Sequence, residues 1–285
     1  MQFPQPILRP ADHAFFVEHG YVVIPEAVPP ENLQAVVDLI FRFLDADPHD
    51  PETWYRPPHR PGGMVEVYQH QALWDNRQHP RVHQIFSEIL GTHRLWVSTD
   101  RACLKPPRHP DHPAYDHKGF IHWDIDTSVL PLPLCVQGVL CLTDTAPDQG
   151  GFQCVPGMHR RLEEWVKTQP SDRDPRRPDL TGLDVRAIPG RAGDMIVWHR
   201  GLPHGNGHNV SASPRLAQYI LMQPPPEPAH EYETQRERRV AMWRERLHPG
   251  GPSFPGDPRE VERRQYQTAE LTPLGRRLLG VDPWE

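Results

Sequence analysis

Short apolar or alternating segments, separated by proline, glycine and aspartate, fill residues 94–222 of this chain. Alternation of this kind is typical of strands with one buried face, and the separating residues are turn formers. Proline makes up 36 of the 285 residues, more than twice its usual share of about 5%, which argues against long helical bundles. The pattern predicts eight strands, at residues 94–104, 120–125, 135–142, 151–155, 184–188, 194–199, 204–208 and 215–222. We therefore expect a mainly β fold with flanking helices, built on a double-stranded β-helix, or jelly-roll (cupin-like), barrel.

Helical patterns flank this stretch on both sides. Before it, residues 11–19 predict a short helix, residues 21–24 a strand, and Pro29 and Pro30 open a helix with one apolar stripe. A further helix, residues 81–90, is expected to end at Gly91. We expect a single domain, residues 1–285, with a helical flank (1–93), a jelly-roll core (94–223) and a C-terminal helical extension (224–285).

Three consecutive prolines, residues 224–226, mark the expected end of the barrel, since proline cannot continue a sheet ladder. A charged helix over residues 230–247 follows, and then a tail rich in proline and glycine. Arginines alternate with glutamates along that helix, which favours a solvated face over an anion site. The sequence does not indicate what the extension does.

Charge and apolar runs exclude several classes of partner. The formal net charge is −6, so no positive field would attract nucleic acid. The apolar runs are too short to cross a bilayer, and the N-terminus lacks the layout of a signal peptide, so we expect no membrane and a cytoplasmic location. The cysteines show no CxxC spacing, and we expect buried, reduced thiols: Cys103, Cys135, Cys141 and Cys154.

A histidine and an aspartate two residues apart, His122 and Asp124, lie within one predicted strand. Residues i and i+2 of a strand point to the same face, so their side chains would share one side of the sheet. His204, which lies in the segment Gly-Leu-Pro-His-Gly-Asn-Gly-His-Asn, is the best candidate for a third ligand. Two histidines and one carboxylate on one face of a metal are the ligand set of non-haem iron(II) oxygenases. An HxD pair alone is a weak signal.

Arg215 strengthens this interpretation because it opens the last predicted strand, shortly after His204. A guanidinium at that depth can bind one end of a dicarboxylate through two parallel hydrogen bonds. The sequence supplies no acidic partner for it. Arg215 could therefore bind a dicarboxylate in the same pocket as the metal.

Five segments together resemble the phytanoyl-CoA dioxygenase family, in the family's order, over about residues 11–223. They are His122-Trp123-Asp124, residues 150–159 (GGFQCVPGMH), residues 193–198 (GDMIVW), residues 204–209 (HGNGHN) and Arg215. The resemblance implies a jelly-roll fold, iron(II) bound by His122, Asp124 and His204, and 2-oxoglutarate bound at its distal carboxylate by Arg215. It also implies O2 as co-substrate and a small-molecule substrate. Asn206, where the family usually has a serine, and Gln137, on the strand that lines the pocket, are weaker candidates for contact with 2-oxoglutarate.

The chain departs from the family pattern at two positions. Val139 aligns where the family often has tryptophan, which affects the expected shape of the pocket. The family commonly has the segment Pro-Gly-Ser-His where this chain has Pro-Gly-Met-His, so Met158 replaces the serine. The adjacent His159 is expected to form a structural hydrogen bond and not to bind metal. The implied reaction converts 2-oxoglutarate and O2 to succinate and CO2 and oxidises a C–H bond. Hydroxylation is favoured, because a related halogenating class has a small residue in place of Asp124.

The substrate is not identified by the sequence. Residues 108–120, which contain His109, His112 and His117, lead into His122 and are expected to form part of the pocket mouth, as are Trp123 and Asp126. A solvated histidine-rich loop is the alternative. A non-catalytic jelly-roll metal-binding or sensor protein, and less so a zinc hydrolase, remain alternatives, although neither needs a dicarboxylate clamp at Arg215. The oligomeric state is left open.

Overall fold

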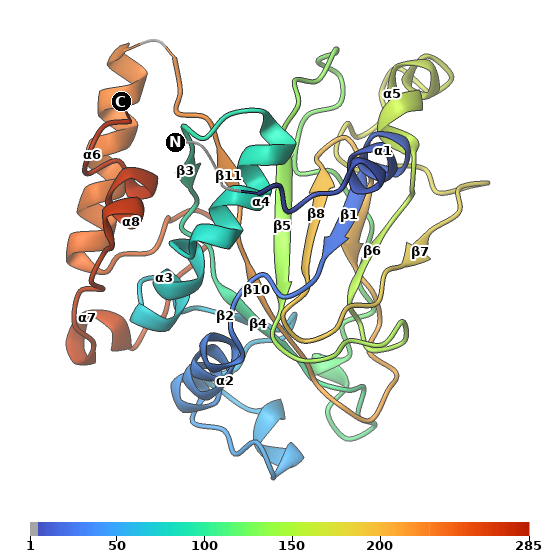
Figure 1. Ribbon diagram of the computed structural model, residues 1–285. Coiled ribbons are helices and arrows are strands. Elements are labelled where there is room, and N and C mark those ends of the chain that lie inside the picture. The colour runs from blue at the N-terminus through green and yellow to red at the C-terminus, as the bar shows by residue number, and fades with distance from the viewer. Residues whose placement is uncertain (1–4, 228, 285) are drawn as a thin grey trace.

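A six-stranded antiparallel sheet forms the centre of the computed structural model, which describes residues 5–227 and 229–284. Its two central strands are buried along most of their length, so the sheet is covered on both faces. Figure 1 shows the sheet at the middle of the molecule. Its strands, in spatial order, are β1 (Tyr21–Ile24), β8 (Met195–His199), β5 (Val136–Cys141), β10 (Arg215–Tyr219), β4 (Ala102–Lys105) and β2 (Met64–Val65).

A three-stranded antiparallel sheet faces one side of this central sheet. It consists of β7 (Arg186–Ala187), β6 (Phe152–Cys154) and β9 (His204–Asn206). Buried side chains from both sheets form a shared core that includes Val139, Phe152, Ile196 and Trp198. A third sheet is the pair β11 (Met222–Gln223) and β3 (Trp96–Val97). The space between the first two sheets is where a site can be enclosed.

Helices cover the other side of the central sheet and its edges. They are α1 (Pro10–His19), α2 (Pro30–Leu44), α3 (Gln71–Arg77) and α4 (Pro80–Leu90), with the 3-10 turns η1 (Pro51–Tyr55) and η2 (Pro113–Tyr115). The apolar stripe of α2 is buried, as the periodicity predicts. Helix α4 ends at Gly91, whose φ of 69° is the left-handed conformation of a C-terminal cap.

The predicted strands are confirmed in part. Residues 94–104 and 215–222 each divide into two strands, because the chain passes from the central sheet to the β11–β3 pair. Residues 120–125 do not form a strand, and only His122 makes a β-bridge there. Helices contain more of the described residues than strands do, so "mainly β" fits the core alone. The predicted flank and extension also include residues 1–4, 228 and 285, which lie outside the described residues.

The C-terminal extension packs against the sheets and helices of the core as three helices, α6 (Ala229–Glu245), α7 (Val261–Gln265) and α8 (Pro273–Leu279). In Figure 1 they lie on the side of the molecule away from α5 (Met158–Lys167). The prediction that the arginines of α6 face solvent is wrong for Arg239. Its guanidinium donates to the carbonyls of Val97, Leu278 and Leu279. Three backbone carbonyls satisfy this cation in place of water.

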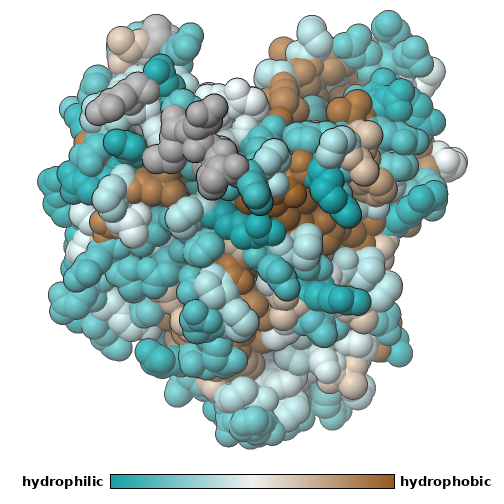
Figure 2. Space-filling view, in the orientation of Figure 1, coloured by the Kyte–Doolittle hydropathy of each residue, from teal (hydrophilic) through white to brown (hydrophobic). Residues whose placement is uncertain are grey.

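The outer surface is largely hydrophilic on the face drawn in Figure 2, with apolar residues gathered around α1 and the strands beside it. Phe15 and Val17 are exposed there at 39% and 65%. Among the described residues, no helix is long and apolar enough to cross a membrane. None of the four cysteines forms a disulfide; Cys103, Cys141 and Cys154 are buried as expected, whereas Cys135 is only partly buried.

Glu262 of α7 fixes the extension to the body of the protein. Its carboxylate is buried and accepts hydrogen bonds from the backbone N–H groups of Tyr68 and Gln69, at 2.8 and 2.6 Å. Burial raises the pKa of Glu262 to about 7, although these hydrogen bonds act in the opposite direction. One side chain thus connects segments that are far apart in the sequence.

Glu262→Ala should lower the free energy of unfolding by about 2–4 kcal/mol, because two buried N–H groups lose their acceptor. Glu262→Gln keeps one acceptor oxygen and should fall between this variant and the parent. Urea unfolding measures both, with Glu245→Ala on exposed α6 as the matched control. Equal stability of Glu262→Ala and Glu245→Ala would show that the carboxylate does not anchor the extension.

Candidate metal centre

A two-residue β-bridge brings His122 and His204 together. Each residue donates its backbone N–H to the carbonyl of the other, at 2.9 Å in both directions. His204 is the first residue of β9, so the smaller sheet determines where His122 lies. The ring centroids are 4.8 Å apart. Because the bridge is made by backbone groups, both imidazoles are placed independently of any ligand.

Asp124 completes the group from the bend that follows His122. Its Oδ1 lies 3.2 Å from Nε2 of His122, and its Oδ2 lies 3.3 Å from Nε2 of His204. Gln137 of β5 donates from Nε2 to Oδ2 of Asp124 at 2.6 Å. The predicted i, i+2 relation of His122 and Asp124 therefore places their side chains together, although the segment is not a strand.

The electrostatics of the group suit a cation. Burial acts to raise the pKa of Asp124, but hydrogen bonds from His122, His204 and Gln137 outweigh it and hold the pKa below its ordinary value. Nδ1 of His204 lies 3.0 Å from the carbonyl of Leu202, which accepts its proton and makes Nε2 the ring nitrogen available to a metal. The ligand atoms of all three residues lie within 4.8 Å of one another. Two imidazole nitrogens and a carboxylate can hold one transition metal.

A cavity of about 620 Å³ opens beside this group. It reaches from the three candidate ligands between the sheets to the C-terminal extension, which supplies Ser253 and Phe254. Gln137, Val139 and Asn206 line it, so the two weaker sequence candidates, Gln137 and Asn206, do reach this space. The buried Oε1 of Gln137 has no hydrogen-bond partner among the described residues. Such a cavity is large enough for two small molecules.

Arg215 lies deeper than the cavity wall. Its Nη1 donates to Oη of Tyr219 at 3.1 Å and contacts Sγ of Cys103 at 3.6 Å. Tyr219 lines the cavity and also accepts a hydrogen bond from Asn206 at 2.8 Å. Arg215 is only 2% exposed, and it forms no ion pair with an acidic residue of the described chain. No hydrogen bond from its Nε or Nη2 to a described residue is found. One edge of this buried cation therefore has no partner among residues 5–227 and 229–284.

Lys105 is a second buried cation, which sequence reasoning missed. It pairs with Arg215 across β4 and β10, and its Nζ donates to the carbonyl of Gly207. Burial lowers the pKa of Lys105 to about 8, and nearby Arg215 acts in the same direction. The alternation of the predicted strand 94–104 could have placed Lys105 at its end, on the face that bears Cys103.

The other residues expected near the mouth take different positions. His117 and Phe120 line the cavity, which agrees with the expected role of residues 108–120. Trp123 does not: it is buried against Trp165, and its indole N–H donates to Gly201. Asp126 is exposed and accepts from Ser128. His159 has the expected structural hydrogen bond, to the carbonyl of Val17 at 3.1 Å.

The chain is similar to known proteins over most of its length. The sequence profile of phytanoyl-CoA dioxygenase (PhyH) matches residues 16–217. A putative phytanoyl-CoA dioxygenase of Dictyostelium discoideum is 27% identical over 262 residues, which covers 74% of each chain.

Two solved structures share the fold. The epimerase SnoN, in complex with Fe3+, alpha ketoglutarate and nogalamycin RO, has a TM-score of 0.54 and 18% identity, over 75% of this chain and 83% of that chain. The non-heme alpha ketoglutarate dependent carbocyclase SnoK from nogalamycin biosynthesis has a TM-score of 0.54 and 22% identity, over 79% and 88%. This fold therefore accommodates more than one outcome of the reaction.

The bridge at His204 requires glycine at the next position. A Cβ on Gly205 would lie 1.9 Å from the carbonyl oxygen of Phe120, whereas a Cβ on Gly207 would meet nothing closer than 3.5 Å. Gly205→Ala should separate β9 from residues 120–122, destabilise the fold by about 1–3 kcal/mol and weaken metal binding. Gly207→Ala is the matched control and should change neither property.

Urea unfolding and anaerobic iron(II) titration of the two glycine variants make this test. If Gly205→Ala binds iron(II) as tightly as Gly207→Ala, the close approach of the two backbones is not what places the imidazoles.

Proposed function

Because the chain belongs to the phytanoyl-CoA dioxygenase family of iron(II)- and 2-oxoglutarate-dependent oxygenases, we propose that it hydroxylates a small organic molecule. In this proposal, His122, Asp124 and His204 are the iron ligands, and they lie on a jelly-roll barrel formed by the two facing sheets. Residues 1–285 act as one domain, in which the extension closes part of the cavity. Family membership makes the chain a dioxygenase-type oxygenase, and the substrate and the hydroxylation are our inference.

The observation that carries the proposal is the ligand group itself. Two imidazole Nε2 atoms and one carboxylate converge at the wall of a cavity, and each is held by a further contact: His122 by the backbone bridge, Asp124 by Gln137 and His204 by Leu202. Such supporting contacts orient metal ligands. A metal held from one side keeps coordination positions open to the cavity.

The unpartnered edge of Arg215 supports a place for 2-oxoglutarate. We assign to it the distal carboxylate of 2-oxoglutarate, bound by Nε and Nη2 in two parallel hydrogen bonds. Lys105, on the neighbouring strand, adds positive charge at the same end. Asn206 donates a hydrogen bond to the Tyr219 hydroxyl and so orients it. The same hydroxyl accepts a hydrogen bond from Nη1 of Arg215. The opposite end of 2-oxoglutarate then reaches the metal ligands.

The reaction combines 2-oxoglutarate, O2 and a substrate C–H group to give succinate, CO2 and an alcohol. Iron(II), held by His122, Asp124 and His204, would supply O2 activation and the electron transfers. The residues of this chain hold the metal, bind the carboxylate and position the C–H group near Asp124 and His122. Retention of a carboxylate at Asp124 favours hydroxylation over halogen transfer.

The substrate would occupy the part of the cavity away from Arg215. Polar residues Ser98, Thr99 and Asp100 line that part, together with Arg101. The guanidinium of Arg101 is paired with Glu66 at 3.0 Å and lies 4.4 Å from the ring centroid of Phe254, so its charge is neutralised within the protein. These groups suit a small molecule that offers hydroxyl or amine groups for hydrogen bonding.

Replacing His122, Asp124 or His204 by alanine should reduce iron from one per chain to near none and abolish succinate formation. The fold should persist, because backbone groups and packed side chains form the cavity. Iron is measured after anaerobic loading with one equivalent of iron(II) and desalting, with exposed His13→Ala as the control. Full iron loading in all three variants contradicts the ligand assignment, and iron loading of the parent without succinate from any screened substrate favours a sensor protein.

Arg215→Ala should weaken 2-oxoglutarate binding by at least about 10-fold, because a charge-assisted hydrogen bond contributes roughly 1.5–3 kcal/mol. Arg215→Lys keeps the charge without the planar fork and should bind with intermediate affinity. Anaerobic titration of 2-oxoglutarate into the iron(II) protein, followed by the metal-to-ligand absorption band, gives each affinity.

Tyr219→Phe is the matched variant for Arg215, since it removes the hydroxyl at Nη1 and leaves the other edge of the guanidinium unchanged. We expect it to retain most of the affinity. If Tyr219→Phe loses as much as Arg215→Ala, the tyrosine hydroxyl binds the carboxylate; if Arg215→Ala loses nothing, Arg215 has no part in the binding.

A further inference from the structure

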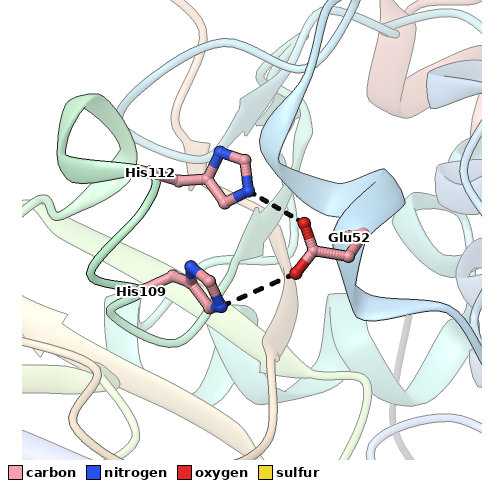
Figure 3. A group of neighbouring side chains, drawn as sticks. All are labelled: Glu52, His109 and His112. Atoms are coloured by element: carbon pink, nitrogen blue, oxygen red, sulfur yellow. Dashed lines mark hydrogen bonds and ion pairs between the residues drawn. The ribbon is translucent and has the colours of Figure 1, made fainter.

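A second group of two histidines and a carboxylate lies outside the cavity. Glu52 belongs to η1, whereas His109 and His112 belong to the loop between β4 and η2. Figure 3 shows both imidazoles pointing at one carboxylate, one toward each oxygen. Nε2 of His112 lies 3.0 Å from Oε2 of Glu52, and Nε2 of His109 lies 3.6 Å from Oε1. None of the three residues lines the cavity.

A buried tyrosine holds the two rings in place. Tyr55 stacks on His112 with 4.8 Å between ring centroids and an interplanar angle of 2°, and its centroid lies 5.3 Å from that of His109. The Tyr55 hydroxyl donates to the carbonyl of Pro107 at 3.0 Å. The side chains of His109 and His112 are only 29% and 28% exposed. Both rings are therefore oriented before any ligand binds.

The spacing of the donor atoms suits a tetrahedral ion. Ligand nitrogens and oxygens lie about 2.0–2.1 Å from zinc, which places tetrahedral ligand atoms about 3.3 Å apart. Nε2 of His112 lies 3.0 Å from Oε2 and Nε2 of His109 lies 3.6 Å from Oε1, so each nitrogen faces a different oxygen, and one oxygen has to turn toward both nitrogens to complete the set. The side chain of Glu52 is 65% exposed and can turn without disturbing the packing. All the donor atoms already lie within 4.8 Å of one another.

We propose that Glu52, His109 and His112 bind one Zn²⁺ ion, with water in the fourth position. Nitrogen and oxygen donors bind Zn²⁺ more tightly than Fe²⁺, so zinc is the expected occupant of this exposed site. Coordination through Nε2 of His109 requires its proton on Nδ1. In the structure that atom accepts a hydrogen bond from the backbone N–H of Asp111 at 3.2 Å, so zinc binding has to replace this contact as the proton moves from Nε2 to Nδ1.

The ion would connect two segments that shape the mouth of the cavity. Through Glu52 it is attached to η1, and through the histidines to the loop that continues to His117 and Phe120 in the cavity wall. Zinc binding should therefore reduce the motion of residues 108–118. Slower amide hydrogen exchange across that loop is the expected signature.

The test uses the full chain with the cavity site removed. In His122→Ala/His204→Ala, calorimetric titration with ZnCl2 should still show one ion per chain. Adding His112→Ala should weaken this binding by at least about 10-fold, and so should adding Glu52→Ala. Adding His49→Ala, a histidine three residues before Glu52 and outside the group, should leave it unchanged.

Absence of zinc binding in His122→Ala/His204→Ala overturns the proposal, and so does binding that His112→Ala leaves unchanged. Retained folding is checked by urea unfolding of each variant, because His112 is partly buried against Tyr55, whereas Glu52 and His49 are exposed. This site and the cavity site are tested separately, because the iron assignment depends on variants that leave Glu52, His109 and His112 intact.

Discussion

The reciprocal backbone hydrogen bonds between His122 and His204 are the contact on which the site depends. They join the segment before Asp124 to β9, so two proposed ligands from distant parts of the sequence meet through backbone contacts alone. Gly205 permits this approach, since a side chain there would collide with the backbone of residue 120. Asp124 then needs only the hydrogen bond from Gln137 to face both imidazoles. The ligand geometry therefore follows from sheet pairing, which is a property of the fold as a whole.

Buried cations without acidic partners define the other end of the cavity. Arg215 and Lys105 are paired across neighbouring strands, and neither forms an ion pair with a carboxylate of the described residues, although Asp116 lies near enough to act on Lys105. Burying unpaired charge is costly, so a bound dianion would stabilise this arrangement. The two ends of the cavity differ in charge. At the proposed substrate side, Glu66 neutralises Arg101, and the ring of Phe254, which belongs to the C-terminal extension, covers its guanidinium. One end is prepared for an anion, and the other is suited to a neutral or cationic polar compound.

Sequence reasoning found the parts that local pattern determines. The alternating strands, the α2 stripe, the Gly91 cap and the candidates His122, Asp124, His204 and Arg215 could all be predicted. It could not find contacts set by tertiary packing. Residues 120–125 form one bridge to β9 in place of the predicted strand. Arg239 donates to backbone carbonyls that are distant in the sequence, which no local pattern reveals. Tyr219 and Lys105 escaped notice because their importance comes from cross-strand neighbours. The Glu52 group joins segments far apart in sequence, so no spacing rule could have indicated it.

An anaerobic crystal structure with iron(II) and 2-oxoglutarate tests the central claim most directly. The account predicts one iron bound by Nε2 of His122, Nε2 of His204 and a carboxylate oxygen of Asp124, at about 2.0–2.2 Å. It also predicts that 2-oxoglutarate spans from the metal to Nε and Nη2 of Arg215. Iron bound by other residues, or 2-oxoglutarate oriented away from Arg215, would contradict it.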